Sequence, residues 1–152
     1  VVDEHLRTSH PDIYAAGDVA NFFHSQLKKR VRIEHEDNAL TSGKLAGRNM
    51  AGAEETYTHV PAFYSDLFDL GYEVVGELSG QLETISDWQE PFRKGVVYYL
   101  AEDEVRGILL WNIWDGVPAA RRILARANDI DSAELNIDLL ISEMAKDEKT
   151  TD

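Results

Sequence analysis

The sequence contains no cysteine, and this absence removes several kinds of chemistry from its 152 residues. Without a thiol there is no disulfide bridge, no thiolate nucleophile and no cysteine-ligated zinc site. A redox-active disulfide therefore cannot lie in this chain.

Positive charge is also scarce, because 15 lysine and arginine side chains stand against 28 aspartate and glutamate side chains. The formal net charge is −13 and the pI is near 4.7. A chain with this excess of acid offers no basic face to a phosphate backbone, so we expect no nucleic-acid partner. The same charge disfavours binding to an anionic membrane surface.

Long hydrophobic runs are missing as well. No apolar stretch approaches the roughly 18 residues that a transmembrane helix needs, so no membrane span is predicted. Hydrophobic residues make up 43% of the chain and charged residues 28%, which is typical of a soluble globular protein. No targeting segment is recognisable, and the cytoplasm is the expected location. A Gly-x-Gly-x-x-Gly dinucleotide fingerprint is also absent.

The most informative stretch is residues 8–19, which read Thr-Ser-His-Pro-Asp-Ile-Tyr-Ala-Ala-Gly-Asp-Val. Its apolar residues 13–16 are predicted to form a buried strand that ends at Gly17. Asp18 would then present an acceptor-only carboxylate just past the carboxyl end of the strand, where open α/β sheets bind ligands. A hydroxyl group of a polyol is a suitable partner. The alternative is that Asp18 merely caps the next turn.

A helix is predicted over residues 35–50. Glu34, Glu36 and Asp37 lie at its start, where negative charge suits the helix dipole. Together with His35 these acids could suggest a metal site. No second histidine lies four residues further on, so the sequence predicts no metal ligand here.

After residue 53 the pattern changes to short strands followed by two helices. Strands are predicted over residues 72–78, 82–88, 95–100 and 105–114, and consecutive short strands with tight turns imply an antiparallel sheet. Asp131 and Glu134 form a capping box that predicts the start of the last helix. We therefore predict an α+β fold in three parts, which are residues 1–53, residues 54–146 and a disordered tail over residues 147–152.

Residues 8–19 resemble the second flavin-binding motif of the FAD-dependent pyridine nucleotide-disulfide oxidoreductases. The resemblance is to the branch that contains apoptosis-inducing factor and the ferredoxin reductases. In that family the aspartate of the motif hydrogen-bonds the ribitol of FAD. The resemblance assigns this role to Asp18 and makes Gly17 and Val19 cofactor-binding residues beside it.

Two further segments carry the same resemblance. Glu34, His35 and the helix after them are similar to the segment that lies against the isoalloxazine ring, with the helix amino terminus facing the pyrimidine edge. Residues 61–68 resemble a Pro-x-Phe-Trp-Ser-Asp string, with Tyr64 where the family has a tryptophan near the flavin. The resemblance therefore implies that Glu34, His35 and Tyr64 bind the cofactor. The alternative role for Tyr64 is that of a core aromatic residue.

The resemblance implies that the chain is the carboxyl-terminal portion of a flavoenzyme. It would hold the last strand and helix of a Rossmann-like FAD domain and then an interface-type or dimerisation-type domain. The whole enzyme would pass electrons from NAD(P)H through FAD to an acceptor such as a ferredoxin, a quinone or dioxygen, and would form a homo-oligomer such as a dimer. No side chain here is expected to act as a catalytic acid or base, and the chain alone is expected to be inactive. The alternative is a non-catalytic interaction or dimerisation domain.

Overall fold

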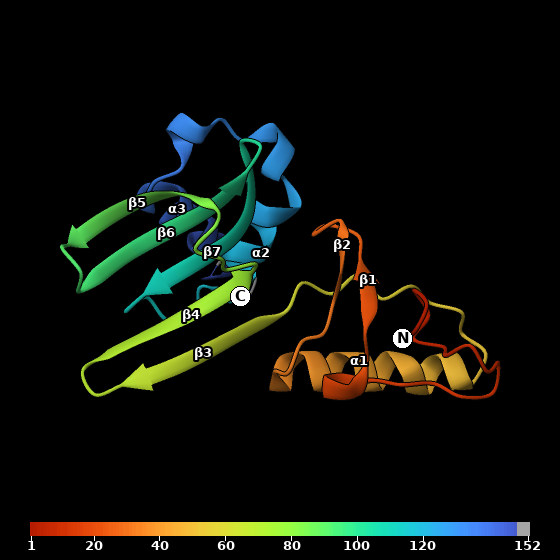
Figure 1. Ribbon diagram of the computed structural model, residues 1–152. Coiled ribbons are helices and arrows are strands. Elements are labelled where there is room, and N and C mark those ends of the chain that lie inside the picture. The colour runs from red at the N-terminus through yellow and green to blue at the C-terminus, as the bar shows by residue number, and fades with distance from the viewer. Residues whose placement is uncertain (149–152) are drawn as a thin grey trace. The chain divides into compact units, whose positions relative to one another are not determined.

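The computed structural model describes residues 1–148, which form two compact units, Val1–Phe63 and a second unit that begins at Tyr64 (Figure 1). Each unit has its own sheet and its own helix or helices. The elements in chain order are η1 (Gly17–Val19), β1 (Phe22–His24), β2 (Lys29–Val31), α1 (Glu36–Met50), β3 (Ala62–Leu67), β4 (Leu70–Gly76), β5 (Glu83–Glu90), β6 (Lys94–Ala101), β7 (Glu104–Trp111), α2 (Val117–Ala125), η2 (Ala127–Asp129), η3 (Ser132–Glu134) and α3 (Ile137–Glu148).

The first unit combines a short hairpin with one long helix. Strands β1 and β2 are antiparallel, with Phe22 opposite Val31. Helix α1 contributes Leu45 and Ala46 to a small hydrophobic core that also holds side chains from both ends of the unit. The other buried members of this core are Val2, Leu6, Ala20, Phe22 and Tyr57. Their burial holds the hairpin and the terminal segments of the unit against the helix.

Residues 13–16 do not form the predicted buried strand. Tyr14 makes one isolated antiparallel bridge with Arg7, and Ile13 is 52% exposed. The backbone hydrogen bonds of this segment run mainly to residues 6–8. A buried strand needs partners for its N–H and C=O groups along its whole length, and here a neighbouring segment supplies them for only part of it.

The first unit extends to Phe63, whereas the predicted boundary lies after residue 53. The extra stretch is fastened to α1 by polar side chains. Asn49 Oδ1 accepts the backbone N–H of Glu55 at 2.7 Å, and Tyr57 O–H donates to Asn38 Oδ1 at 2.9 Å. Glu55 and Tyr57 are therefore bonded to the helix before them, whereas the last two residues of the unit already form the start of β3.

The second unit is built on a five-stranded sheet with the strand order β3-β4-β7-β6-β5. The pairs β4–β7, β7–β6 and β6–β5 are antiparallel, with Tyr98 opposite Ile108 and Val96 opposite Leu110. All four of these side chains are fully buried, and helices α2 and α3 lie on one side of the sheet (Figure 1). The predicted α+β class and antiparallel sheet are confirmed, and the sheet has one strand, β3, that the sequence did not indicate.

Helix α3 begins at Ile137 and not at Asp131 as predicted. Asp131 accepts a backbone N–H at the start of the short η3 helix instead. Asn136 Oδ1 accepts the Leu139 N–H at 2.9 Å, and Asp87 of β5 accepts the Ile137 N–H at 2.9 Å. The start of α3 is therefore set partly by a contact with the sheet, which a local capping pattern does not contain.

The last helix also reaches further than predicted. Asp147 and Glu148 are part of α3 rather than of a disordered tail. Arg122 of α2 donates to both carboxylate oxygens of Asp147, at 2.8 and 2.9 Å, which fastens this end of the helix. The rest of the predicted tail, residues 149–152, lies outside the described residues.

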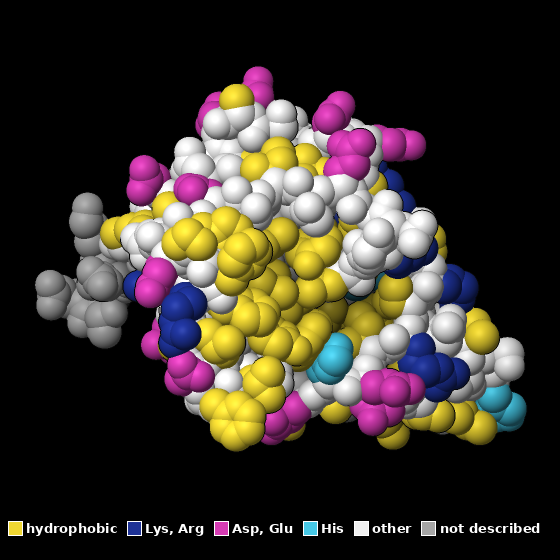
Figure 2. Space-filling view, turned by 60° about the vertical axis from the view of Figure 1, so that its left-hand side comes forward, with side chains coloured by type: hydrophobic (Ala, Val, Ile, Leu, Met, Phe, Trp, Pro, Cys, Tyr) yellow, Lys and Arg dark blue, Asp and Glu magenta, His cyan; other side chains and the backbone are white. Residues whose placement is uncertain are grey.

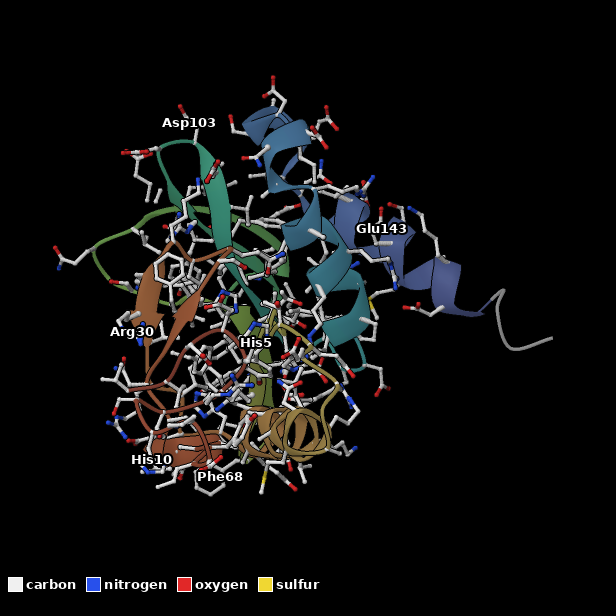
Figure 3. All side chains as sticks on the ribbon, turned by 90° about the vertical axis from the view of Figure 1, so that its right-hand side faces the viewer. His5, His10, Arg30, Phe68, Asp103 and Glu143 are labelled. Carbon is white, nitrogen blue, oxygen red and sulfur yellow. The ribbon has the colours of Figure 1, made fainter. Side chains whose placement is uncertain are left out.

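Glu143 of α3 is the buried centre of an ion-pair cluster (Figure 3). Its side chain is 4% exposed and contacts the charged groups of Arg122, Arg126 and Lys146. These cations, Lys146 foremost, hold the pKa of Glu143 below its ordinary value of 4.5. The carboxylate joins α3 to α2.

We expect Glu143→Gln to lower the free energy of unfolding at neutral pH by about 1–3 kcal/mol, because a charged acceptor is lost. Since the folded-state pKa of Glu143 is depressed, its contribution is present above the pKa of the unfolded chain and is lost as the pH falls through the folded-state pKa. Urea unfolding should therefore show wild type and variant converging below pH 4.5. Glu134→Gln removes an exposed carboxylate and is the control. A difference between wild type and Glu143→Gln that stays constant with pH would contradict the assignment.

Candidate functional site

The turn after residues 13–16 has a conformation that favours glycine. Gly17 has a φ angle of 67°, a region that residues with a Cβ enter only at a cost. An added Cβ would also lie 3.4 Å from the Cβ of Ala39 on α1. The Gly17 N–H donates to Ser42 Oγ at 2.9 Å, so the turn is held closely against the helix.

Asp18 and Val19 are exposed on this turn. Their carbonyl oxygens each accept a hydrogen bond from Nη1 of Arg32, at 2.9 Å. Among the residues described, no hydrogen bond or ion pair engages the Asp18 carboxylate. Asp18 therefore does not cap the turn, and its carboxylate can accept hydrogen bonds from the hydroxyl groups of a ligand.

Helix α1 begins at Glu36, with His35 as an extended N-cap residue whose φ is −126° and ψ is 147°. The His35 side chain makes no capping hydrogen bond, and the acids Glu36 and Asp37 lie in the first turn. The first N–H groups of a helix have no acceptor within the helix. This end of α1 therefore favours negative charge on a neighbouring group.

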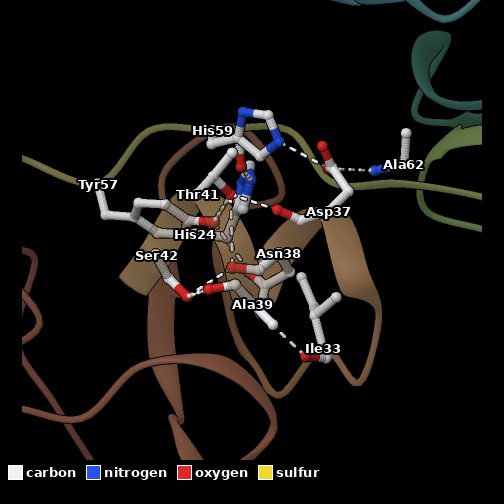
Figure 4. A network of polar contacts seen from close by, with 10 residues as sticks. All are labelled: His24, Ile33, Asp37, Asn38, Ala39, Thr41, Ser42, Tyr57, His59 and Ala62. Carbon is white, nitrogen blue, oxygen red and sulfur yellow. Dashed lines mark hydrogen bonds and ion pairs between the residues drawn. The ribbon is translucent and has the colours of Figure 1, made fainter. Parts of the chain in front are cut away.

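A buried polar network fastens the start of α1 to the rest of the first unit (Figure 4). Asn38 is completely buried; its Nδ2 donates to Ile33 O and its Oδ1 accepts from Tyr57 O–H, both at 2.9 Å. Ser42 Oγ donates to Asn38 O at 2.5 Å and accepts from the Gly17 N–H. Because its members are hydrogen-bonded, the network keeps the helix start and the Gly17 turn in one arrangement.

Glu34 and His35 lie in the loop before α1. Glu34 is exposed. The imidazole of His35 stacks on the ring of Phe63, with ring centroids 4.3 Å apart and planes inclined by 20°. One face of the imidazole is thus covered by an aromatic residue, and the predicted contact of His35 with an isoalloxazine ring stays a prediction.

Tyr64 lies in the second unit, on β3, and is 66% exposed. This exposure does not fit the alternative role of a core aromatic residue. Its contact with a flavin stays a prediction.

Within residues 1–148, no group of three or more histidine, cysteine, aspartate or glutamate side chains is arranged to hold a metal ion. In the same part of the chain, no helix is both long and apolar enough to cross a membrane.

The structure brings Gly17, Asp18 and Val19 together with α1. Three residues that hold this arrangement were not predicted from the sequence, namely Arg32, Asn38 and Ser42. Each of them bonds to backbone groups, and in the case of Arg32 the acceptors lie in a separate segment of the chain. A pattern of side-chain types along one sequence contains no signal for such bonds.

The chain is similar to known proteins over most of its length. It matches the protein family described as "Apoptosis-inducing factor, mitochondrion-associated, C-term" over residues 46–91 and 86–126. It is 36% identical over 132 residues to apoptosis-inducing factor 1, mitochondrial, of Dictyostelium discoideum, which covers 79% of this chain and 25% of that protein. It is 30% identical over 148 residues to monodehydroascorbate reductase of Pisum sativum, which covers 93% of this chain and 34% of that protein. The chain thus spans about a quarter to a third of the length of these curated relatives.

A solved structure shares the fold. The crystal structure of the covalent putidaredoxin reductase–putidaredoxin complex matches with a TM-score of 0.76 and 25% sequence identity. The match covers 95% of this chain and 36% of that chain.

Proposed function

The chain belongs to the family of the apoptosis-inducing factor carboxyl-terminal domain. We therefore propose that it is the carboxyl-terminal part of an FAD-dependent NAD(P)H oxidoreductase. The first unit supplies the ribitol and pyrimidine sides of the FAD site, and the second unit is the carboxyl-terminal α+β domain. The whole protein passes electrons from NAD(P)H through FAD to an acceptor. The observation that carries the proposal is the Asp18 carboxylate, which has no partner within residues 1–148 and lies on a turn that is fixed against α1.

The residues present fit a flavin nucleotide. Gly17 has no Cβ, so a ligand can approach the turn closely. The exposed Asp18 carboxylate is an acceptor for polyol hydroxyl groups, and the amino end of α1 favours a group that carries negative charge. The residues of the first unit that would hold FAD are Gly17, Asp18, Val19, Glu34 and His35, and the flavin contact of Tyr64 stays a prediction from the resemblance.

FAD, when bound, supplies the hydride and electron chemistry, while the protein supplies orientation and electrostatics. Asp18 would orient the ribitol by accepting its hydrogen bonds. The N–H groups of the first turn of α1 would stabilise negative charge on the pyrimidine side of the ring, and the network around Asn38 holds that turn in place. No residue of the chain is assigned as a catalytic acid or base.

A ferredoxin is the acceptor that we favour, because the fold matches include putidaredoxin reductase in covalent complex with putidaredoxin and a ferredoxin reductase from Rhodopseudomonas palustris, at 26% identity and a TM-score of 0.73. A quinone or dioxygen is the alternative acceptor. A dimeric homo-oligomer and a cytoplasmic location both stay predictions from the sequence. Light scattering and the localisation of a tagged protein test them.

An absorbance spectrum of the full-length protein, recorded before and after addition of NADH or NADPH, tests the proposal. We expect the absorbance bands of a bound flavin and their bleaching by one of the two nucleotides. A colourless protein that also fails to take up added FAD would contradict the proposal.

We expect Tyr64→Ala to change the visible spectrum or the reduction potential of the bound flavin and to leave the melting temperature nearly unchanged. The reason is that Tyr64 is 66% exposed, so little packing is lost when the ring is removed. Phe68→Ala is the control, since it removes a fully exposed aromatic ring from the same β3–β4 hairpin. If Tyr64→Ala and Phe68→Ala leave the flavin equally unperturbed, Tyr64 does not touch the cofactor.

A non-catalytic interaction domain is the second candidate function, and one observation favours it. Several large hydrophobic side chains of the second unit are exposed, and exposed hydrophobic side chains are coloured yellow in Figure 2. The most exposed are Tyr64, Leu67, Phe68 and Phe92. A partner that binds this unit equally well with and without FAD would favour this function, whereas nucleotide-dependent bleaching of a flavin favours the enzyme.

A further inference from the structure

Arg32 lies in the loop between β2 and α1, and its guanidinium bonds to backbone rather than to a carboxylate. Its Nη1 donates to the carbonyl oxygens of Asp18 and Val19, both at 2.9 Å. Hydrogen bonds from a charged donor are stronger than those between neutral groups. The guanidinium therefore holds the backbone of the turn that carries Asp18, whose side chain is the predicted ribitol contact.

The same turn is held from the other side by α1. Ser42 Oγ accepts the Gly17 N–H at 2.9 Å and donates to Asn38 O. Successive residues of the turn are thus bonded to two different segments, while the Asp18 carboxylate itself has no partner among the residues described. This arrangement leaves the carboxylate available to a ligand and restricts the backbone conformation that sets its direction.

We propose that Arg32 is a positioning residue for FAD, which fixes the Asp18 turn so that the carboxylate is pre-organised for the ribitol. The inference rests on the proposed function. Arg32 also precedes His35 by three residues, so its bonds to the turn set the spacing between the Asp18 turn and the amino end of α1. Pre-organisation raises affinity because less conformational freedom is lost when the ligand binds.

Arg30, which lies on β2 two residues before Arg32, offers a matched control. Its Nη2 donates to Val2 O at 2.7 Å and to Asn21 O at 3.3 Å, and its Nε donates to Asn21 Oδ1 at 3.1 Å. Arg30 therefore makes backbone bonds of the same kind as Arg32, but they run to Val2 and Asn21 and not to the carbonyl oxygens of Asp18 and Val19. Its loss should lower stability without changing the cofactor site.

The experiment uses the full-length protein, stripped of flavin and titrated with FAD, with the visible circular dichroism of the bound flavin as a second readout. We expect Arg32→Met to weaken FAD binding roughly tenfold, the loss that follows from removing a hydrogen bond made by a charged group. Arg32→Lys should lose less, because lysine keeps the charge but not the planar fork. Arg30→Met should bind FAD as wild type does. If Arg32→Met lowers only the melting temperature, as Arg30→Met does, the proposal is overturned.

A double-mutant cycle with Asp18→Ala tests whether Arg32 acts through Asp18. We expect Arg32→Met to weaken FAD binding much less in the Asp18→Ala background than in the wild type. Additive losses would overturn the positioning role. The failure of the proposed function is distinguishable, because then the wild-type protein itself takes up no FAD. If Asp18→Ala weakens FAD binding and Arg32→Met does not, the positioning role of Arg32 is contradicted and the proposed function is not.

Discussion

Asp18→Ala in the full-length protein is expected to weaken FAD binding about tenfold or more. A hydrogen bond to a charged acceptor contributes about 1.5–3 kcal/mol, and each 1.4 kcal/mol corresponds to about a factor of ten in affinity. The loss should be large because the carboxylate has no other partner among the residues described and the turn beneath it is fixed. The measurement is flavin retention after extended dialysis, together with titration of the stripped protein with FAD.

Two further variants sharpen this test. Asp18→Asn keeps the size of the side chain and one acceptor oxygen, so its affinity for FAD should lie between those of wild type and Asp18→Ala. Asp12→Ala removes another exposed carboxylate from the preceding loop and should not alter FAD binding. Full flavin retention by Asp18→Ala would remove Asp18 from the cofactor site.

Gly107→Ala is expected to destabilise the second unit more than any other change considered. Gly107 lies in β7 opposite Gly76 of β4, which has a φ angle of 83°. An added Cβ at Gly107 would overlap the carbonyl oxygen of Glu77 and lie 2.6 Å from its carbonyl carbon and 2.9 Å from its nitrogen. These are backbone atoms, so a side-chain rotation cannot relieve the overlap and the strands must move apart.

We expect Gly107→Ala to cost on the order of 3 kcal/mol, the upper part of the range for overpacking. For a unit of this size that loss corresponds to roughly 12–24 °C in melting temperature. Thermal unfolding followed by circular dichroism measures it. Gly80→Ala is the matched control, because an added Cβ there meets nothing within 4 Å. Equal melting temperatures for the two variants would show that the backbone at Glu77 does not lie this close to Gly107 of β7.

Local patterns predicted most elements of the second unit well. The four predicted strands lie within a few residues of β4, β5, β6 and β7, because apolar residues and turns repeat at short range. The predicted helix over residues 35–50 matches α1, Glu36–Met50, for the same reason.

The failures of prediction share a different cause. Residues 13–16 have the composition of a buried strand, but a strand exists only where another segment supplies its hydrogen-bond partners. Helix α3 begins at Ile137 because Asp87 of β5 accepts its N–H, a contact between residues far apart in the sequence. The stretch up to Phe63 belongs to the first unit because Asn38 and Asn49 bond to it.

The sequence by itself determined the chemistry available to this protein: no thiol, a helix start that favours negative charge, and a Gly17–Asp18 pair suited to a polyol. Only the tertiary structure decided that the Asp18 carboxylate has no partner in the described part of the chain while the backbone around it is bonded. That outcome depends on two side chains from other segments of the chain. Arg32 donates to the carbonyl oxygens of Asp18 and Val19, and Ser42 accepts the N–H of Gly17. Backbone groups are the same in every residue, so which of them a side chain reaches is settled by how the chain folds.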